Sequence, residues 1–153
     1  PENAVQCALR GAWGAHNWRR DIRIERRTLS RQAMISEIHG QGHVYVSASR
    51  GEGADMPAFE AKLAGRRIVT TDSGGPRDFL GEHDILVPAT GEYPMEEYAW
   101  LWGPGAKVID YDLGDLVTAM VRARGRTPRR SDMGKFSAKS VAGVFREMFE
   151  KWE

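Results

Sequence analysis

Residues 49–61 have the sequence Ser-Arg-Gly-Glu-Gly-Ala-Asp-Met-Pro-Ala-Phe-Glu-Ala. The stretch lies between two short apolar runs, His43–Ala48 and Arg67–Thr71. This order predicts a strand, a glycine-bearing turn, a helix and a second strand. In open α/β sheets, ligands bind beyond the carboxyl ends of the strands, where this turn would lie. Glu52 in the turn and Glu60 in the helix make it a candidate nucleotide-binding crevice.

Short apolar runs alternate with helix-period runs along the chain. The predicted strands are Val5–Leu9, Ile22–Ile24, Val44–Ala48, Ile68–Thr71, Ile85–Val87 and Val108–Tyr111. Helices are predicted from a cap at Ser30 to Ile38, from a cap at Asp55 to Gly65, at Pro76, over Leu113–Val121 and at the C-terminus. Nearly continuous apolar strands are typical of strands covered on both faces. The pattern predicts an α/β fold with a Rossmann-like, doubly wound parallel sheet.

Composition narrows the function classes. The 153 residues, 41% of them apolar, fit one domain. A net charge of +1 gives no field that would recruit nucleic acid, so we expect no nucleic-acid partner. The single cysteine, Cys7, excludes an internal disulfide and favours a reducing compartment. No apolar run approaches the ~20 residues of a membrane span, and we expect a cytoplasmic protein.

The turn has the chemistry of an anion site. Gly51 and Gly53 let backbone amides approach a ligand with no Cβ in the way. The helix that begins near Met56 and Pro57 directs free N–H groups and its positive dipole end at the crevice, which favours a phosphate or diphosphate. Arg50 adjoins the turn and is the candidate cation; a solvated loop residue is the alternative.

Other side chains border the same crevice. Glu60, one turn into the helix, can accept hydrogen bonds from both hydroxyls of a ribose, or it is a solvated helix residue. Glu52 can accept hydrogen bonds from the hydroxyls of a bound sugar. Gly74 and Gly75 permit a tight bend at a strand end, either beside this site or as a plain turn.

Taken in order, these motifs resemble the donor-binding half of the retaining glycosyltransferases of family four, which have the GT-B fold. The family pattern is Ser-x-x-Glu-Gly-Phe-Gly-Leu-Pro-x-x-Glu-Ala, a small-residue glycine turn, a strand and Asp-x-Gly-Gly. It is matched by residues 49–61, Ala64-Gly65-Arg66, residues 68–71 and Asp72–Gly75. Asp21–Ile24 and the tail from Phe136 also resemble family elements.

The resemblance implies a nucleotide-sugar donor and transfer with retention at the anomeric carbon, with no cofactor and no obligatory metal. Glu52 matches the glutamate beside the donor sugar and is the predicted catalytic residue. Glu60 matches the glutamate that holds the ribose. The predicted donor-binding residues are Arg27, Thr28, Arg50, Gly53, Ala54, Asp55, Met56, Glu60, Gly74 and Gly75.

The resemblance also implies that residues 1–153 are one GT-B half domain, the C-terminal nucleotide-sugar-binding domain. We expect it to lack its first strand and its partner, the N-terminal acceptor-binding domain, and to be inactive alone. Arginines near the C-terminus form a solvated loop or, more weakly, a peripheral contact with anionic lipid at the inner face of a membrane. They are Arg122, Arg124, Arg126, Arg129 and Arg130.

One departure from the family pattern leaves alternatives open. Ala54-Asp55 stands where the family has Phe-Gly. Asp55 is expected to cap the helix, and its charge is unfavourable beside a diphosphate unless it faces away or binds a sugar hydroxyl. The alternatives are a GT-B sugar-nucleotide epimerase and a degenerate, non-catalytic module that binds protein or glycan.

Three further groups of side chains are assigned structural roles. The aromatic residues of segment 91–105 are expected to pack in the core, with stacking on sugar rings as the alternative: Tyr93, Tyr98, Trp100 and Trp102. The apolar face of the last helix is expected to dock on this domain's own core, with an absent domain as the alternative. The histidines are expected to be non-catalytic and to form no metal site: His16, His39, His43 and His83.

Overall fold

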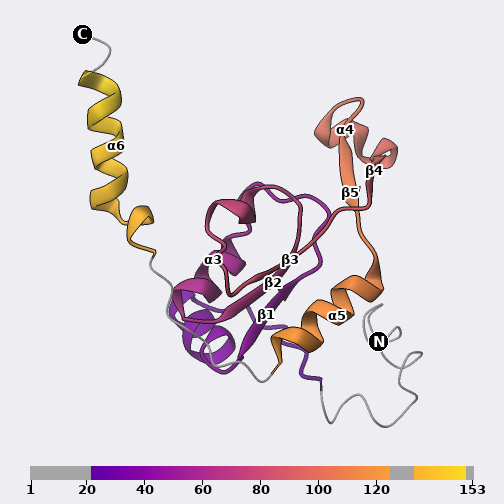
Figure 1. The fold of residues 1–153 in the computed structure, drawn as a ribbon, viewed down its shortest axis with the longest axis horizontal. Helices are drawn as coiled ribbons and strands as arrows, with labels where there is room; N and C mark the ends of the chain where they lie inside the picture. Colours follow the sequence, from indigo (N-terminus) through magenta and orange to yellow (C-terminus); the bar gives the residue numbers. More distant parts are fainter. Residues whose placement is uncertain (1–21, 125–132, 151–153) are drawn as a thin grey trace. The chain divides into compact units, whose positions relative to one another are not determined.

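The computed structural model describes residues 22–124 and 133–150 (Figure 1). The chain divides into two compact units, residues 1–30 and 31–153, and each is treated by itself. In the first unit, residues 22–30 form no helix or strand, so the predicted strand Ile22–Ile24 is wrong. A strand persists only with a partner for its backbone groups, and residues 22–30 contain no second strand that could supply one. The predicted strand Val5–Leu9 lies outside the described residues.

The second unit contains a parallel sheet of three strands in the order β1-β2-β3. The strands are β1 (Val44–Ser47), β2 (Arg67–Thr71) and β3 (Ile85–Val87). Val44 lies opposite Arg67, and Val69 lies opposite Ile85. All three strands were predicted, and their parallel pairing is confirmed.

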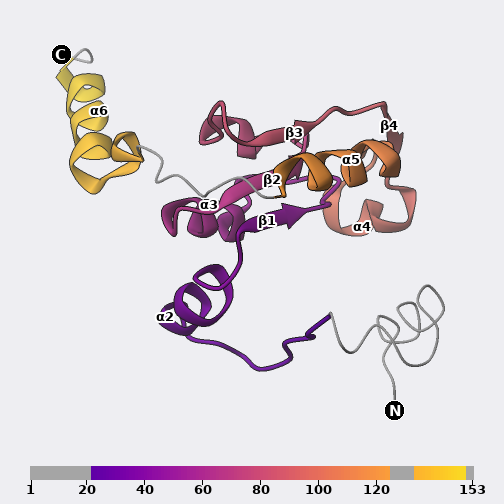
Figure 2. The same cartoon turned by 60° about the horizontal axis from the view of Figure 1, so that its bottom comes forward.

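Helices cover both faces of this sheet (Figure 2). Neighbouring residues of a strand point to opposite faces, and Ile68 and Val69 of β2 lie in separate clusters. Val69 packs with Val87 and with α5 (Leu113–Ala123), whereas Ile68 packs with Phe79 and with α3 (Met56–Leu63). The predicted α/β fold class, a Rossmann-like layered sheet, is therefore confirmed.

The helix before β1 differs from the regular helix predicted from Ser30. A short α2 (Arg31–Ala33) leads into a π-helix, η1 (Met34–His39). The amide of Gly40 donates to the Ile35 carbonyl over 2.7 Å, five residues back. Such wide turns occur frequently at functional sites, and this one ends on the buried side chain of His39.

The predicted strand at Val108 belongs to a separate sheet. We call residues 91–110 the arm: β4 (Gly91–Pro94) pairs antiparallel with β5 (Lys107–Asp110), and η3 (Glu96–Tyr98) and α4 (Ala99–Trp102) lie between them. The prediction that β5 joins the parallel sheet is wrong. Trp100 is 81% and Trp102 65% exposed, so the expectation that they pack in the core is wrong as well. A two-stranded ribbon offers no second layer to cover them.

A short 3₁₀ turn, η2 (Gly75–Asp78), lies between β2 and β3. Near the C-terminus, the chain packs against α3. In η4 (Gly134–Phe136), the ring of Phe136 lies edge-on to that of Phe59 with centroids 5.3 Å apart. The last helix, α6 (Ala138–Glu150), keeps Val144 and Phe145 more than half exposed. For these side chains, the prediction of core docking is wrong.

Among the described residues, no helix has the length and apolar character of a membrane span, and the cytoplasmic location stays a prediction.

Candidate functional site

The two predicted turns form one structure at the carboxyl ends of β1 and β2. The amide of Glu52 donates to the Ser73 carbonyl over 3.4 Å, and the amide of Gly75 donates to the Glu52 carbonyl over 3.3 Å. These bonds continue the parallel ladder by one isolated bridge, between Glu52 and Gly74. The Glu52 turn and the Gly74-Gly75 turn, 22 residues apart in sequence, are therefore neighbours, and we call the pair the joined turns.

Each glycine of the second turn is required for its own reason. Gly74 has φ +111°, a backbone conformation that residues other than glycine rarely adopt. A Cβ on Gly75 would lie 1.8 Å from the Gly53 carbonyl oxygen. The backbones of the joined turns thus touch at Gly53 and Gly75, which fixes the position of one turn against the other.

Asp55 caps α3, as predicted. Its Oδ1 accepts a hydrogen bond from the Ala58 amide over 3.2 Å and one from the Tyr45 hydroxyl over 3.4 Å. The residue is buried, and Oδ2 has no hydrogen-bond partner among the described residues. Burial, with the charge of Asp55 adding to it, raises the pKa of Tyr45 to about 12. The carboxylate is turned into the protein, which reduces the conflict with a bound anion.

The cap leaves fewer amides for an anion than the sequence suggested. Pro57 has no N–H, the Ala58 amide bonds the Asp55 carboxylate, and the Phe59 amide bonds the Asp55 carbonyl over 3.0 Å. Near the helix start, four amides have no partner among the described residues: those of Gly53, Ala54, Asp55 and Met56.

Glu60 is held between two basic side chains. Its Oε1 lies 3.2 Å from Nε of Arg31, and its Oε2 lies 3.9 Å from Nε2 of His39. His39 Nε2 is buried with no hydrogen-bond partner among the described residues. Burial lowers the pKa of His39, while the Glu60 charge opposes this shift. No local sequence motif marked His39, because its approach to Glu60 depends on the π-helix.

Arg50 is directed toward the arm. Its guanidinium bonds the Tyr93 hydroxyl, lies 3.2 Å from an Asp110 carboxylate oxygen and sits over the Tyr93 and Tyr111 rings at 5.1 and 5.4 Å. The hydrogen bond that Arg50 donates to the Tyr93 hydroxyl is the main cause that raises the pKa of Arg50. Its carbonyl accepts from the Ile109 amide over 2.9 Å. The predicted diphosphate contact of Arg50 stays a prediction.

Arg27 and Thr28 lie in the first unit. The Arg27 side chain bonds the Glu25 carboxylate over 2.7 Å, and this bond is the main cause that lowers the pKa of Glu25. Their base-binding role stays a prediction, as do the roles of Glu52, Glu60 and the turn residues. The described residues hold no group of histidine, cysteine, aspartate and glutamate suited to a metal ion.

Comparison with known proteins identifies the family. A part of the protein named GTPase Der from Streptomyces coelicolor (strain ATCC BAA-471 / A3(2) / M145) is 30% identical over 105 residues. That alignment covers 67% of this chain, and the chain spans only 22% of that protein. Residues 12–97 match the model of the family described as glycosyl transferases group 1, a range that contains both joined turns and Glu60. The match extends over more than half of the 153 residues, and the chain belongs to the group 1 glycosyl transferases.

Proposed function

We propose that this chain is the donor-binding half of a retaining glycosyltransferase and binds a nucleoside-diphosphate sugar at the joined turns. The observation that supports this most directly is the contact between the Glu52 turn and the Gly74-Gly75 turn at the carboxyl ends of two parallel strands, where α/β sheets bind ligands. The acceptor would come from a separate acceptor-binding domain, since a GT-B enzyme acts between two such halves.

The proposed roles follow from the groups that are free to bind. The amides of Gly53, Ala54 and Met56 would hold the diphosphate and stabilise the charge that develops on it as the sugar leaves. Glu52 would face the donor sugar. Glu60 would accept hydrogen bonds from the ribose hydroxyls in exchange for part of its contact with Arg31. No step in this scheme needs a metal ion.

A degenerate, non-catalytic module is the second candidate, and the Asp55 cap favours it. The cap occupies the Ala58 amide and adds a negative charge at the start of α3. The name of the Streptomyces relative refers to GTP hydrolysis, and we do not assign that activity to this chain. The sequence does not contain the Gly-x-x-x-x-Gly-Lys-Ser/Thr loop that cradles nucleoside triphosphates.

The test is a nuclear magnetic resonance titration of the 153-residue chain with UDP, GDP and ADP. We expect one nucleotide to bind in the millimolar range and to shift the amide signals of Gly53, Ala54 and Met56. Glu60→Gln should weaken it about tenfold, because the loss of a charged hydrogen-bond partner costs ~1.5–3 kcal/mol. Glu82→Gln, at a side chain that is 89% exposed, is the matched control.

Two results would count against the proposal in different ways. Equal nucleotide affinity of Glu60→Gln and the unchanged chain would remove the ribose role of Glu60. The absence of shifts with all three nucleotides would favour the non-catalytic module. In the complete enzyme, analysis of the product formed from a labelled donor separates transfer from epimerisation.

A further inference from the structure

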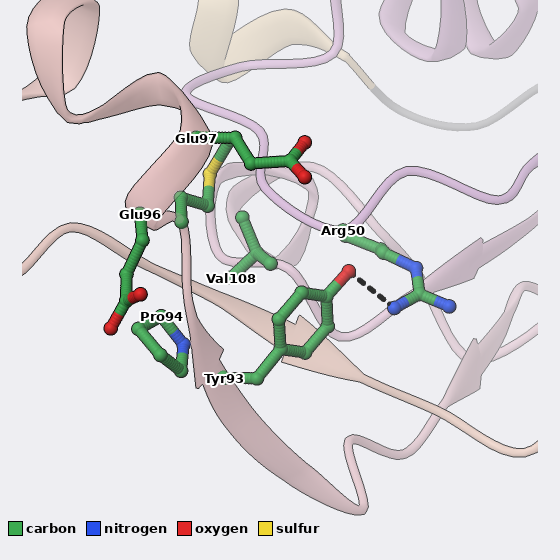
Figure 3. A pocket seen from close by; sticks show the side chains of 7 residues that line it. Arg50, Tyr93, Pro94, Glu96, Glu97 and Val108 are labelled. Carbon is green, nitrogen blue, oxygen red and sulfur yellow. Dashed lines mark hydrogen bonds between the residues drawn. The ribbon is translucent and has the colours of Figure 1, made fainter.

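A cavity of about 590 Å³ lies between the Glu52 turn and the arm (Figure 3). Arg50 and Val108 line it together with residues 93–97 of the arm. It borders the turn closely, because a Cβ on Gly51 would lie 3.7 Å from Cγ1 of Val108. Its volume is within the range of small-molecule sites, ~300–1,000 Å³. None of the arm's lining residues was assigned to the donor.

The lining combines apolar surface with a few polar groups. Pro94, Met95 and Val108 supply the apolar part, and Tyr93 adds a ring with a hydroxyl. Figure 3 shows Glu97 reaching toward the side where Arg50 meets Tyr93, while Glu96 points the other way. An aromatic face beside carboxylates can pack against the C–H surface of a sugar while the carboxylates accept its hydroxyl hydrogens.

Charge decides against an anionic ligand. The positive charge of Arg50 is already balanced by Asp110, whose carboxylate oxygen is 3.2 Å from the guanidinium. Glu97, whose carboxylate reaches toward the Arg50 side, therefore leaves the cavity with an excess of negative charge, which repels phosphates and sugar acids. A neutral, hydroxyl-rich molecule meets neither this repulsion nor the cost of burying its own charge.

We propose that this cavity binds a neutral sugar unit of a glycan. Arg50 immediately precedes Gly51 and Glu52, so the bound sugar unit would lie next to the donor sugar. That this unit belongs to the acceptor rests on the proposed function. The exposed indole rings of Trp100 and Trp102, on α4 of the same arm, offer stacking surfaces for neighbouring units of the glycan.

The experiment is saturation-transfer magnetic resonance on the 153-residue chain with maltose, cellobiose, lactose and methyl mannoside as probes. We expect at least one probe to bind with a millimolar Kd. Glu97→Gln should weaken it fivefold or more, and Tyr93→Leu, which removes the ring, should abolish it. The matched control is Glu92→Gln, an exposed carboxylate of β4 that pairs with Lys107 over 3.5 Å and does not line the cavity.

Three outcomes would overturn the inference. They are no saturation transfer from the protein to any probe, equal transfer to the probe from Glu97→Gln and from the unchanged chain, and tighter binding of glucuronate than of the neutral sugars. Glu97→Gln changes an exposed side chain, so it tests the sugar contact even if Tyr93→Leu disturbs the fold of the arm. Titrating the same samples with UDP, GDP and ADP separates the two proposals. Sugar binding without nucleotide binding would reject only the donor site, and the reverse would reject only the sugar cavity.

Discussion

At the scale of single residues, Asp55 explains its own departure from the family pattern. It is the only non-glycine residue with positive φ among those described, at φ 49° and ψ 64°. The left-handed region suits a residue without Cβ, such as the glycine of the pattern that this turn resembles, and aspartate is among the few other residues that tolerate it. Aspartate adds a cap and a charge, so the position exchanges anion affinity for helix stability.

Replacing Asp55 separates these two effects. Asp55→Gly keeps the left-handed conformation, frees the Ala58 amide and removes the charge, so it should tighten nucleoside diphosphate binding several-fold and cost only a few tenths of a kcal/mol in stability. Asp55→Ala loses the cap and strains the backbone, for a total loss of ~2–3 kcal/mol. Calorimetric titration and chemical denaturation measure the two quantities. Weaker binding by Asp55→Gly would mean that the carboxylate contacts the ligand.

His39 makes stability depend on pH. Its folded pKa is lowered by burial, so between that pKa and the ordinary 6.5 the unfolded chain binds more protons than the folded one. The contribution is fully present above pH 6.5 and is lost as the pH falls toward the folded pKa. We expect denaturation curves of His39→Gln to lose stability less steeply from pH 7.5 to 5 than those of the unchanged chain. His83→Gln, at an exposed histidine, is the matched control.

At the scale of elements, the joined turns depend on the contact between Gly53 and Gly75. Gly75→Ala would put a methyl group against the Gly53 carbonyl, and backbone cannot move aside as a flexible side chain can. We expect a loss of ~2–3 kcal/mol in unfolding free energy and a change in the amide signals of residues 52–54. Gly91→Ala, where nothing lies within 4 Å of the added methyl, should cost far less. Equal losses would show that the turns separate without penalty.

The sequence predicted those elements whose signals are local. Strands β1, β2 and β3 follow from apolar runs, and the start of α3 follows from the Asp55 cap. The arm could not be predicted, because it depends on the pairing of two segments far apart in the sequence, and the π-helix was predicted only as a regular helix. Val108 and Ile109 form a short apolar run like those of β1 and β2, but the partner of this strand is β4, and only that pairing decides which sheet it joins. In the site, the glycines and carboxylates were recognisable, whereas the direction of Arg50 depends on Tyr93 and Asp110.

At the scale of the whole molecule, stability is concentrated around the parallel sheet. Leu116 of α5 is buried against β2 and β3, whereas Val144 of α6 is 59% exposed. Leu116→Ala should cost ~2–4 kcal/mol, and Val144→Ala should stay within ~0.5 kcal/mol. Chemical denaturation of both variants measures this. A large loss for Val144→Ala would show that the apolar face of α6 is covered within this chain.

Arg50 has a consequence for how events at its two sides depend on each other. Its carbonyl accepts a hydrogen bond from Ile109 of β5, and its guanidinium donates one to Tyr93. Because the next residue begins the Glu52 turn, the arm and the turn are joined with no flexible loop between them. Linkage requires that any factor by which occupancy of the arm changes affinity at the turn is returned unchanged in the other direction. Any cooperativity between the two sides would therefore be carried in part by Arg50, and its size would be the same whichever molecule binds first.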